Sequence, residues 1–164
     1  MNIREIVEVV DKKIINTCIR CNGIFARVAL FVVFFWFGIL KVVTESPANP
    51  LVDSLLQRTL PFFTFEEFIV WFGLFEVLIG IIFLIPKWER FALLLLAVHM
   101  ITTFGPIVML PEMVWSAPFV PTLEGQYIVK NLIIIALAIG IVANLRPMTH
   151  SHRLEEAEGP ETAA

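Results

Sequence analysis

Residues 68–85 read FIVWFGLFEVLIGIIFLI and contain a single charged side chain, Glu76. At a rise of 1.5 Å per residue, a helix of this length nearly crosses the roughly 30 Å hydrocarbon core of a bilayer. A charge at that depth is costly unless it pairs, faces a cavity or takes part in chemistry. Gly73 and Gly80 share a helix face with Glu76, and glycines on membrane helices mark where a neighbouring helix comes close. We therefore expect a transmembrane helix with Glu76 pointing into a helix bundle.

Three further stretches have the same apolar character: 24–43, 91–110 and 127–145. The 164-residue chain is 58% hydrophobic and only 16% charged, with a mean hydropathy of +0.84. A bilayer core offers no partners to backbone polar groups, so such spans must be helical. The length suits one domain. The predicted fold class is therefore all-α, an integral membrane four-helix bundle.

The segments outside the spans have their own patterns, which divide the chain into a surface segment (1–22), the bundle (23–146) and a polar, acidic, disordered tail (147–164). In the first of these, residues 3–21 place Ile3, Val7, Val10, Ile14 and Cys18 on one helix face. Such an amphipathic helix usually lies along the membrane surface. Asn49-Pro50 is typical of a helix start, and Pro61 ends the segment, which predicts a short interfacial helix in the first outer loop. The apolar third loop, 106–125, is expected to cover the outer mouth of the bundle.

The distribution of basic residues predicts the orientation. Eight of them fall on one side of the spans: Arg4, Lys12, Lys13, Arg20, Lys87, Arg90, Arg146 and Arg153. The other side has Arg58 alone. The positive-inside rule then places both termini in the cytoplasm, as in a multi-pass protein of the cytoplasmic (inner) membrane whose first span is a retained helix. The formal net charge of −3 comes largely from the acidic tail, which gives no indication of a nucleic-acid partner.

The polar residues within the spans are the candidates for function. Lys41 and Lys130 both lie toward the outer side, and either could reach Glu76; Asn131 is next to Lys130. One interpretation is a structural ion pair that fixes helix register. The other is a polar pocket for a small ligand or a proton path. Arg27 lies at the inner edge of its span, where reaching out to lipid headgroups is a sufficient explanation.

His99 stands near the middle of the third span and is followed by Thr102 and Thr103 on one polar face. Histidine titrates near neutral pH, so His99 could relay protons, or it could simply be satisfied by a neighbouring hydroxyl. A haem held by two histidines of one chain is excluded, because the membrane segments contain no second histidine. The candidate pocket therefore comprises Lys41, Glu76, His99, Lys130 and Asn131.

Cys18 and Cys21 form a CxxC spacing at the cytoplasmic edge. Such a pair can be a redox dithiol, and Arg20 could make a thiol more reactive. The alternative is two small apolar residues on a membrane-facing helix. A zinc site needs four ligands and the sequence has no second cysteine pair, so no metal site is predicted.

Three segments of the chain resemble the DoxX-like family of small membrane proteins, most closely its reactive-chlorine-resistance branch. The segments are Arg27 through Phe35-Trp36-Phe37-Gly38 to Lys41, Gly73-Leu74-Phe75-Glu76-Val77-Leu78-Ile79-Gly80, and Gly125-Gln126-Tyr127-Ile128-Val129-Lys130-Asn131. Thr102-Thr103 and the loop that ends in Pro121-Thr122-Leu123 also suit that branch. The resemblance implies a four-helix bundle in a cytoplasmic membrane, linked to membrane oxidoreductase systems and to oxidative stress.

The expected function is that of a membrane subunit or accessory of a redox or oxidative-stress system, with a quinone or a small oxidant as the candidate ligand of the polar pocket and no cofactor identified. The alternatives are a small transporter or proton-coupled permease, and a non-catalytic membrane assembly protein. Whether the chain is an enzyme stays open at this point. The expected partners are the lipid bilayer, other membrane or redox subunits, and a second copy of the chain.

Overall fold

The computed structural model describes residues 2–44 and 46–145, and these residues are mostly helical. Four of the described helices are long and apolar enough to cross a membrane: α1 (Ile3–Val43), α3 (Phe65–Leu84), α4 (Glu89–Met109) and α6 (Leu123–Val142). They correspond to the four spans expected from the sequence. The chain is therefore an integral membrane protein with four helical spans.

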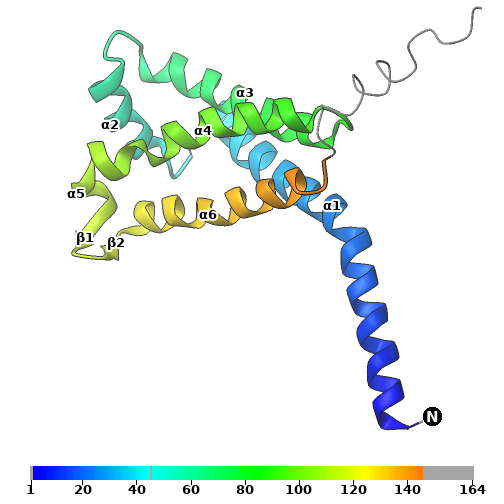
Figure 1. The fold of residues 1–164 in the computed structure, drawn as a ribbon. Helices are drawn as coiled ribbons and strands as arrows, with labels where there is room; N and C mark the ends of the chain where they lie inside the picture. Colours follow the sequence, from blue (N-terminus) through cyan, green and yellow to red (C-terminus); the bar gives the residue numbers. More distant parts are fainter. Residues whose placement is uncertain (1, 45, 146–164) are drawn as a thin grey trace, which may run out of the picture.

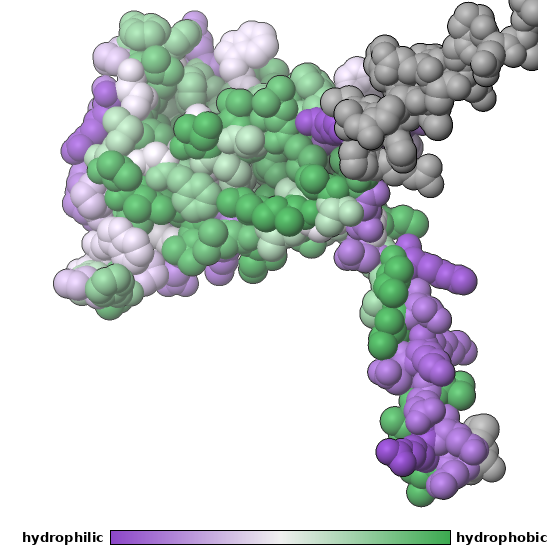
Figure 2. Space-filling view, in the orientation of Figure 1, coloured by the Kyte–Doolittle hydropathy of each residue, from purple (hydrophilic) through white to green (hydrophobic). Residues whose placement is uncertain are grey.

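The four long helices form a ring around a shared core (Figure 1). α1 packs most extensively against α3, α3 contacts α4, α4 contacts α6, and α6 returns to α1. The centre contains Leu30 of α1 together with Ile79 and Phe83 of α3, all fully buried. The outer surface is apolar too: Trp71 and Ile101 are 72% and 74% exposed, and Figure 2 shows apolar residues over the visible side of the bundle. This arrangement suits a bundle surrounded by lipid.

The first helix differs from the expectation of a separate surface helix before the first span. Residues 3–21 are helical, as predicted, but α1 continues through them without a break for 41 residues. The sequence from Ile3 to Val43 contains no proline, and Gly23 is tolerated within a helix at a modest cost. We call residues 3–22 the N-terminal arm. Figure 1 shows the arm projecting away from the bundle, so the boundary expected at residue 22 is not the end of a helix.

The end of the bundle opposite the arm is closed by shorter elements (Figure 1). The expected short helix in the first outer loop is present as α2 (Asn49–Thr59), with a proline in its first turn. The third loop contains α5 (Pro111–Val114) and a small antiparallel hairpin of β1 (Trp115–Ala117) and β2 (Val120–Pro121), which the all-α expectation did not include. Arg58 joins these parts by donating to the carbonyl oxygen of Met109 at 2.5 Å and to Glu112 at 3.1 Å.

α1 and α3 come into backbone contact where they cross at Gly38 and Gly73. A Cβ atom added to either glycine would lie 2.7 Å from the carbonyl oxygen of the other. No side chain fits there without moving backbone, so both positions require glycine for the helices to touch. Lys41 and Glu76 each follow one of these glycines by three residues, on the same helix face. The crossing therefore determines how close these two side chains come.

Candidate functional site

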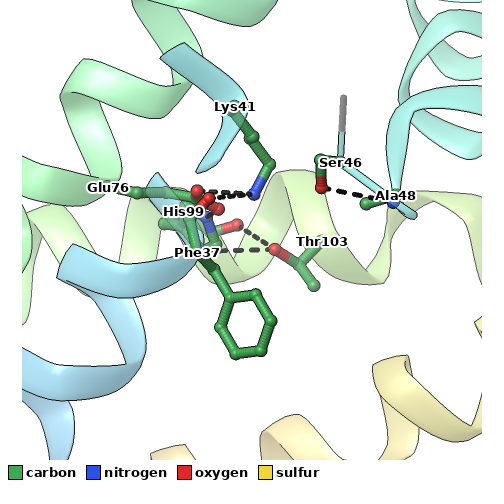
Figure 3. Close-up of polar contacts among 7 residues, drawn as sticks. All are labelled: Phe37, Lys41, Ser46, Ala48, Glu76, His99 and Thr103. Atoms are coloured by element: carbon green, nitrogen blue, oxygen red, sulfur yellow. Dashed lines mark hydrogen bonds and ion pairs between the residues drawn. The ribbon is translucent and has the colours of Figure 1, made fainter. Parts of the chain in front are cut away.

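Three of the sequence-predicted site residues meet inside the bundle, one from each of three spans (Figure 3). The Nζ of Lys41 on α1 lies 2.6 Å from Oε2 of Glu76 on α3. The Nε2 of His99 on α4 lies 2.9 Å from Oε1 of the same carboxylate. We call Lys41, Glu76 and His99 the core triad. Each carboxylate oxygen thus faces a nitrogen from a different helix.

The core triad is almost completely shielded by the protein. Lys41, Glu76 and His99 are 7%, 6% and 5% exposed. Removing an isolated charge from water costs several kcal/mol, so a carboxylate at this depth needs a compensating partner. The ammonium group of Lys41 supplies it. As the spacing of Gly73 and Gly80 predicted, Glu76 points into the bundle.

The second ring nitrogen of His99 also has a partner. The Nδ1 atom lies 3.2 Å from the hydroxyl oxygen of Thr103, and that hydroxyl is 2.9 Å from the backbone carbonyl oxygen of His99. A neutral His99 that donates through Nε2 accepts the Thr103 proton at Nδ1. A doubly protonated His99 donates from Nδ1 to the Thr103 oxygen, which then donates to the carbonyl. The same geometry therefore serves both protonation states of the imidazole without moving a side chain.

Aromatic rings form the walls around His99. Phe72 stacks on the imidazole with ring centroids 5.3 Å apart and an interplanar angle of 13°, and Phe34 meets it edge-on at 5.2 Å. The Lys41 ammonium lies 5.6 Å from the centre of the Phe72 ring, within range of a cation–π contact. These rings exclude water and hold the imidazole plane, so the donors of the core triad stay directed at the carboxylate.

A second ion pair lies toward the arm end of the bundle. Arg27 of α1 donates from Nη2 to Oε1 of Glu89, the first residue of α4, at 2.5 Å. The interpretation of Arg27 as reaching only for lipid headgroups is therefore incomplete. Glu89 was missed because it lies just before the apolar stretch that marks the third span. A signal for this pair was available in the sequence. Glu89 is an acidic residue at the start of one span, and Arg27 is a basic residue at the same edge of another span.

An apolar layer separates this edge pair, Arg27 and Glu89, from the core triad. Its members are buried side chains of α1, α3 and α4: Leu30, Phe34, Ile79, Phe83 and Leu96. None of these side chains can carry a proton. The layer therefore divides the interior into two polar regions, one near each end of the bundle.

The structure does not bring Lys130 to the core triad. Its side chain is exposed, and its Nζ lies 5.2 Å from the centre of the Tyr127 ring on the same helix. The buried residues of α6 include Gly125 and Ile128, and Lys130 lies two residues beyond Ile128, nearly on the opposite side of the helix. Asn131 is half-buried. Among the contacts recorded for the described residues, none joins Lys130 or Asn131 to Glu76.

Cys18 and Cys21 lie in the N-terminal arm as free thiols, the first exposed and the second half-buried. Cys21 is separated from Lys41 by about 30 Å of helix, at 1.5 Å per residue. The thiols therefore do not belong to the core triad. Within residues 2–44 and 46–145, no group of three or more histidine, cysteine or acidic side chains is arranged to hold a metal ion.

Comparison with known proteins gave no match: no family model, curated protein or solved structure is significantly similar to this chain. The resemblance to DoxX-like proteins is thus not supported by these comparisons. What stands is an integral membrane protein with four helical spans and a buried triad of ionisable side chains.

Proposed function

We propose that the chain is a membrane subunit or accessory of a redox or oxidative-stress system, and that the core triad is its functional centre. Reduction of a quinone consumes two electrons and two protons. In this proposal a quinone-like oxidant binds beside the triad and a partner subunit supplies two electrons. His99 passes two protons to the quinone in turn, taking up a proton from the solvent after the first transfer, while Glu76 holds the imidazole in place. The chain itself then needs no redox cofactor.

The observation that supports the proposal most is the hydrogen-bond chain that runs through His99. Glu76, His99 and Thr103 are linked in series at 2.9 Å and 3.2 Å. A proton can enter or leave the imidazole while each neighbour keeps a partner, and histidine is the side chain whose ordinary titration range includes neutral pH. Intramembrane ionisable residues arranged in this way commonly mark proton relays.

The resemblance to DoxX-like proteins belongs to the same proposal, since that family is linked to membrane oxidoreductase systems. So does the expected placement in the cytoplasmic membrane with both termini inside, which follows from the distribution of basic residues. Lys130 and Asn131 remain proposed contributors. Asn131, which is half-buried, would take part if a ligand bound between α6 and the triad, whereas Lys130 would first have to turn inward from the exposed side of α6.

The test is Glu76→Gln, which removes the charge and preserves the shape. Cells that lack the gene are complemented with each variant and challenged with hypochlorite, and the purified proteins are assayed for binding of a short-chain quinone. We expect Glu76→Gln to lose both protection and binding while its circular dichroism spectrum stays helical. Glu89→Gln is the matched control, because it makes the same change in the edge pair, and it should keep both.

A packing or assembly protein is the second candidate, and one observation favours it: both Glu76 oxygens already have internal partners. In that case Glu76→Gln would lower the unfolding midpoint and leave protection against hypochlorite intact.

A proton-coupled permease is the third candidate. The apolar layer that closes the triad off from the arm end supports it, because access from one side at a time is what alternating transport requires. Proteoliposomes without Glu76-dependent flux would remove this candidate.

A further inference from the structure

The N-terminal arm has an apolar side that the rest of the described chain leaves uncovered. Eight of its aliphatic side chains are exposed, and four of these lie on one side: Ile3 at 79%, Val7 at 59%, Val10 at 49% and Ile14 at 57%. They recur at intervals of three and four residues, so they form one stripe along the helix. Cys18 continues this stripe and is exposed as well. A stripe of this length in contact with water would be costly, so it needs a covering surface.

The stripe on the arm is aligned with the lipid-facing side of the first span. Eighteen residues make about five full turns of an α-helix, so positions that far apart point in the same direction. Residues of the arm and exposed residues of the span pair in this way: Val7 with Phe25, Val10 with Val28, Ile14 with Val32, and Cys18 with Trp36. Phe25, Val32 and Trp36 are 71%, 50% and 61% exposed on the outside of the bundle. The apolar side of the arm is therefore the same side of α1 that faces lipid.

The polar side of the arm shows the complementary alignment. Moving eighteen residues along α1 connects four polar arm residues to four buried span residues: Glu8 to Ala26, Lys12 to Leu30, Asn16 to Phe34, and Arg20 to Gly38. The side that faces the bundle within the span is thus mostly polar in the arm, although Val9 and Ile19 are exposed there too, at 59% and 70%. The lipid-facing side of α1 is apolar along both the span and the arm, whereas the side that faces the bundle changes from apolar in the span to mostly polar in the arm.

We propose that the arm lies on the bilayer surface, with Val7, Val10, Ile14 and Cys18 at the boundary between headgroups and acyl chains. The covering surface is then a continuation of the lipid that already surrounds the span. Figure 1 shows the arm leaving the bundle, and Figure 2 shows polar residues along much of its length. A helix that bends away from its bundle turns its lipid-facing side down onto the neighbouring lipid. Its polar side then faces water, which is the arrangement of an interfacial helix.

The edges of the stripe suit headgroups. Lys13 and Arg20 lie along one edge and Arg4 along the other, where long cationic side chains can extend to phosphate oxygens. Of the acidic residues, Glu5 and Glu8 lie farther from the stripe, on the polar side, whereas Asp11 borders the stripe beside Cys18. The proposed partner is therefore the bilayer surface as a whole, with the apolar stripe as the main contact.

The test measures the depth of two neighbouring positions in the full-length protein. Both native thiols are removed (Cys18→Ser with Cys21→Ser), and a single cysteine is added by Val10→Cys or, as the matched control, by Lys12→Cys. Each variant is labelled with an environment-sensitive fluorophore. The proteins are placed in nanodiscs of phosphatidylcholine and phosphatidylglycerol, with or without doxyl-labelled lipid. Circular dichroism checks that both variants remain helical.

We expect doxyl lipid to quench the label at position 10 and to leave the label at position 12 bright, with aqueous iodide showing the reverse. Equal quenching by iodide at both positions would overturn the proposal, because the stripe would then face water. A label at position 10 shielded from both quenchers, together with intermolecular crosslinking there, would also overturn it and identify a second copy of the chain as the cover. A Cys18-only protein (Cys21→Ser) should behave like the Val10→Cys variant.

Discussion

The core triad and the edge pair use similar chemistry in two different surroundings. In the core triad, the side chains of Lys41 and Glu76 are 6% and 8% exposed, and the cation is enclosed on all sides. In the edge pair, Glu89 is equally buried, but Arg27 keeps 26% of its side chain exposed. A cation that reaches the surface can be partly satisfied by water or headgroups, whereas an enclosed one depends on its partner. Loss of the cation should therefore lower the stability of the protein more in the core triad than in the edge pair.

The largest effect should follow from Lys41→Met, which removes the cation and keeps the volume. Breaking a buried pair leaves an uncompensated charge and typically costs 3–5 kcal/mol. Because His99 still faces the Glu76 carboxylate, we expect the lower end, about 3 kcal/mol. Denaturant titration in detergent, followed by circular dichroism, measures the change.

The control for this variant is the double change Lys41→Met with Glu76→Met. Replacing both members of a buried pair by apolar residues is often neutral for stability, so the double variant should recover most of the loss. If it is as unstable as Lys41→Met alone, the cost comes from packing at position 41 and not from the unpaired carboxylate. Burial of the unpaired carboxylate would then not explain why the core triad contributes more to stability than the edge pair.

A smaller effect is expected from Thr103→Val, which replaces the hydroxyl next to His99 by a methyl group of similar size. The Nδ1 atom loses its partner, and an unmade hydrogen bond to a buried group costs about 1 kcal/mol. Thr102→Val is the matched control, because the Thr102 hydroxyl bonds only the backbone carbonyl of His99, at 2.7 Å. The same denaturant titration should rank Thr103→Val below Thr102→Val in stability. Equal values would mean that Thr103 does not support the imidazole.

The smallest effect is expected at the edge. Arg27→Gln should destabilise by no more than about 1 kcal/mol, because water reaches Arg27 and the backbone N–H groups of Lys87 and Glu89 still bond the Glu89 carboxylate when the guanidinium is gone. The loss should shrink when the titration is repeated in high salt, while the loss from Lys41→Met should not change. An Arg27→Gln variant as unstable as Lys41→Met would remove the distinction between the two sites.

Much of the bundle was predictable because its signals lie within single helices. The length of each apolar stretch indicated four spans, and the spacing of Gly73, Glu76 and Gly80 indicated which side of α3 faces inward. Both features depend on local periodicity, which the sequence displays directly. The position of Lys41 near the end of its span was sufficient to suggest a partner for Glu76.

The features that were missed depend on how helices rotate and pair. Lys130 was a reasonable partner for Glu76 by depth, but the rotation of α6 turns it outward beside Tyr127. A weakly patterned apolar helix does not reveal this rotation, because nearly every side of it is hydrophobic. Arg27 and Glu89 are 62 residues apart in sequence. Their contact follows from packing between spans, which single-helix patterns do not contain.

The contact between Gly38 and Gly73 has a consequence for how the bundle can change shape. Where two backbones touch, neither helix can slide or rotate past the other without a clash, so α1 and α3 act as one rigid block. Lys41 and Glu76 both belong to that block, and their separation is fixed with it. His99 comes from α4, outside the block. A gain or loss of charge at the carboxylate would therefore act on the contact with α4 and not on the crossing of α1 and α3.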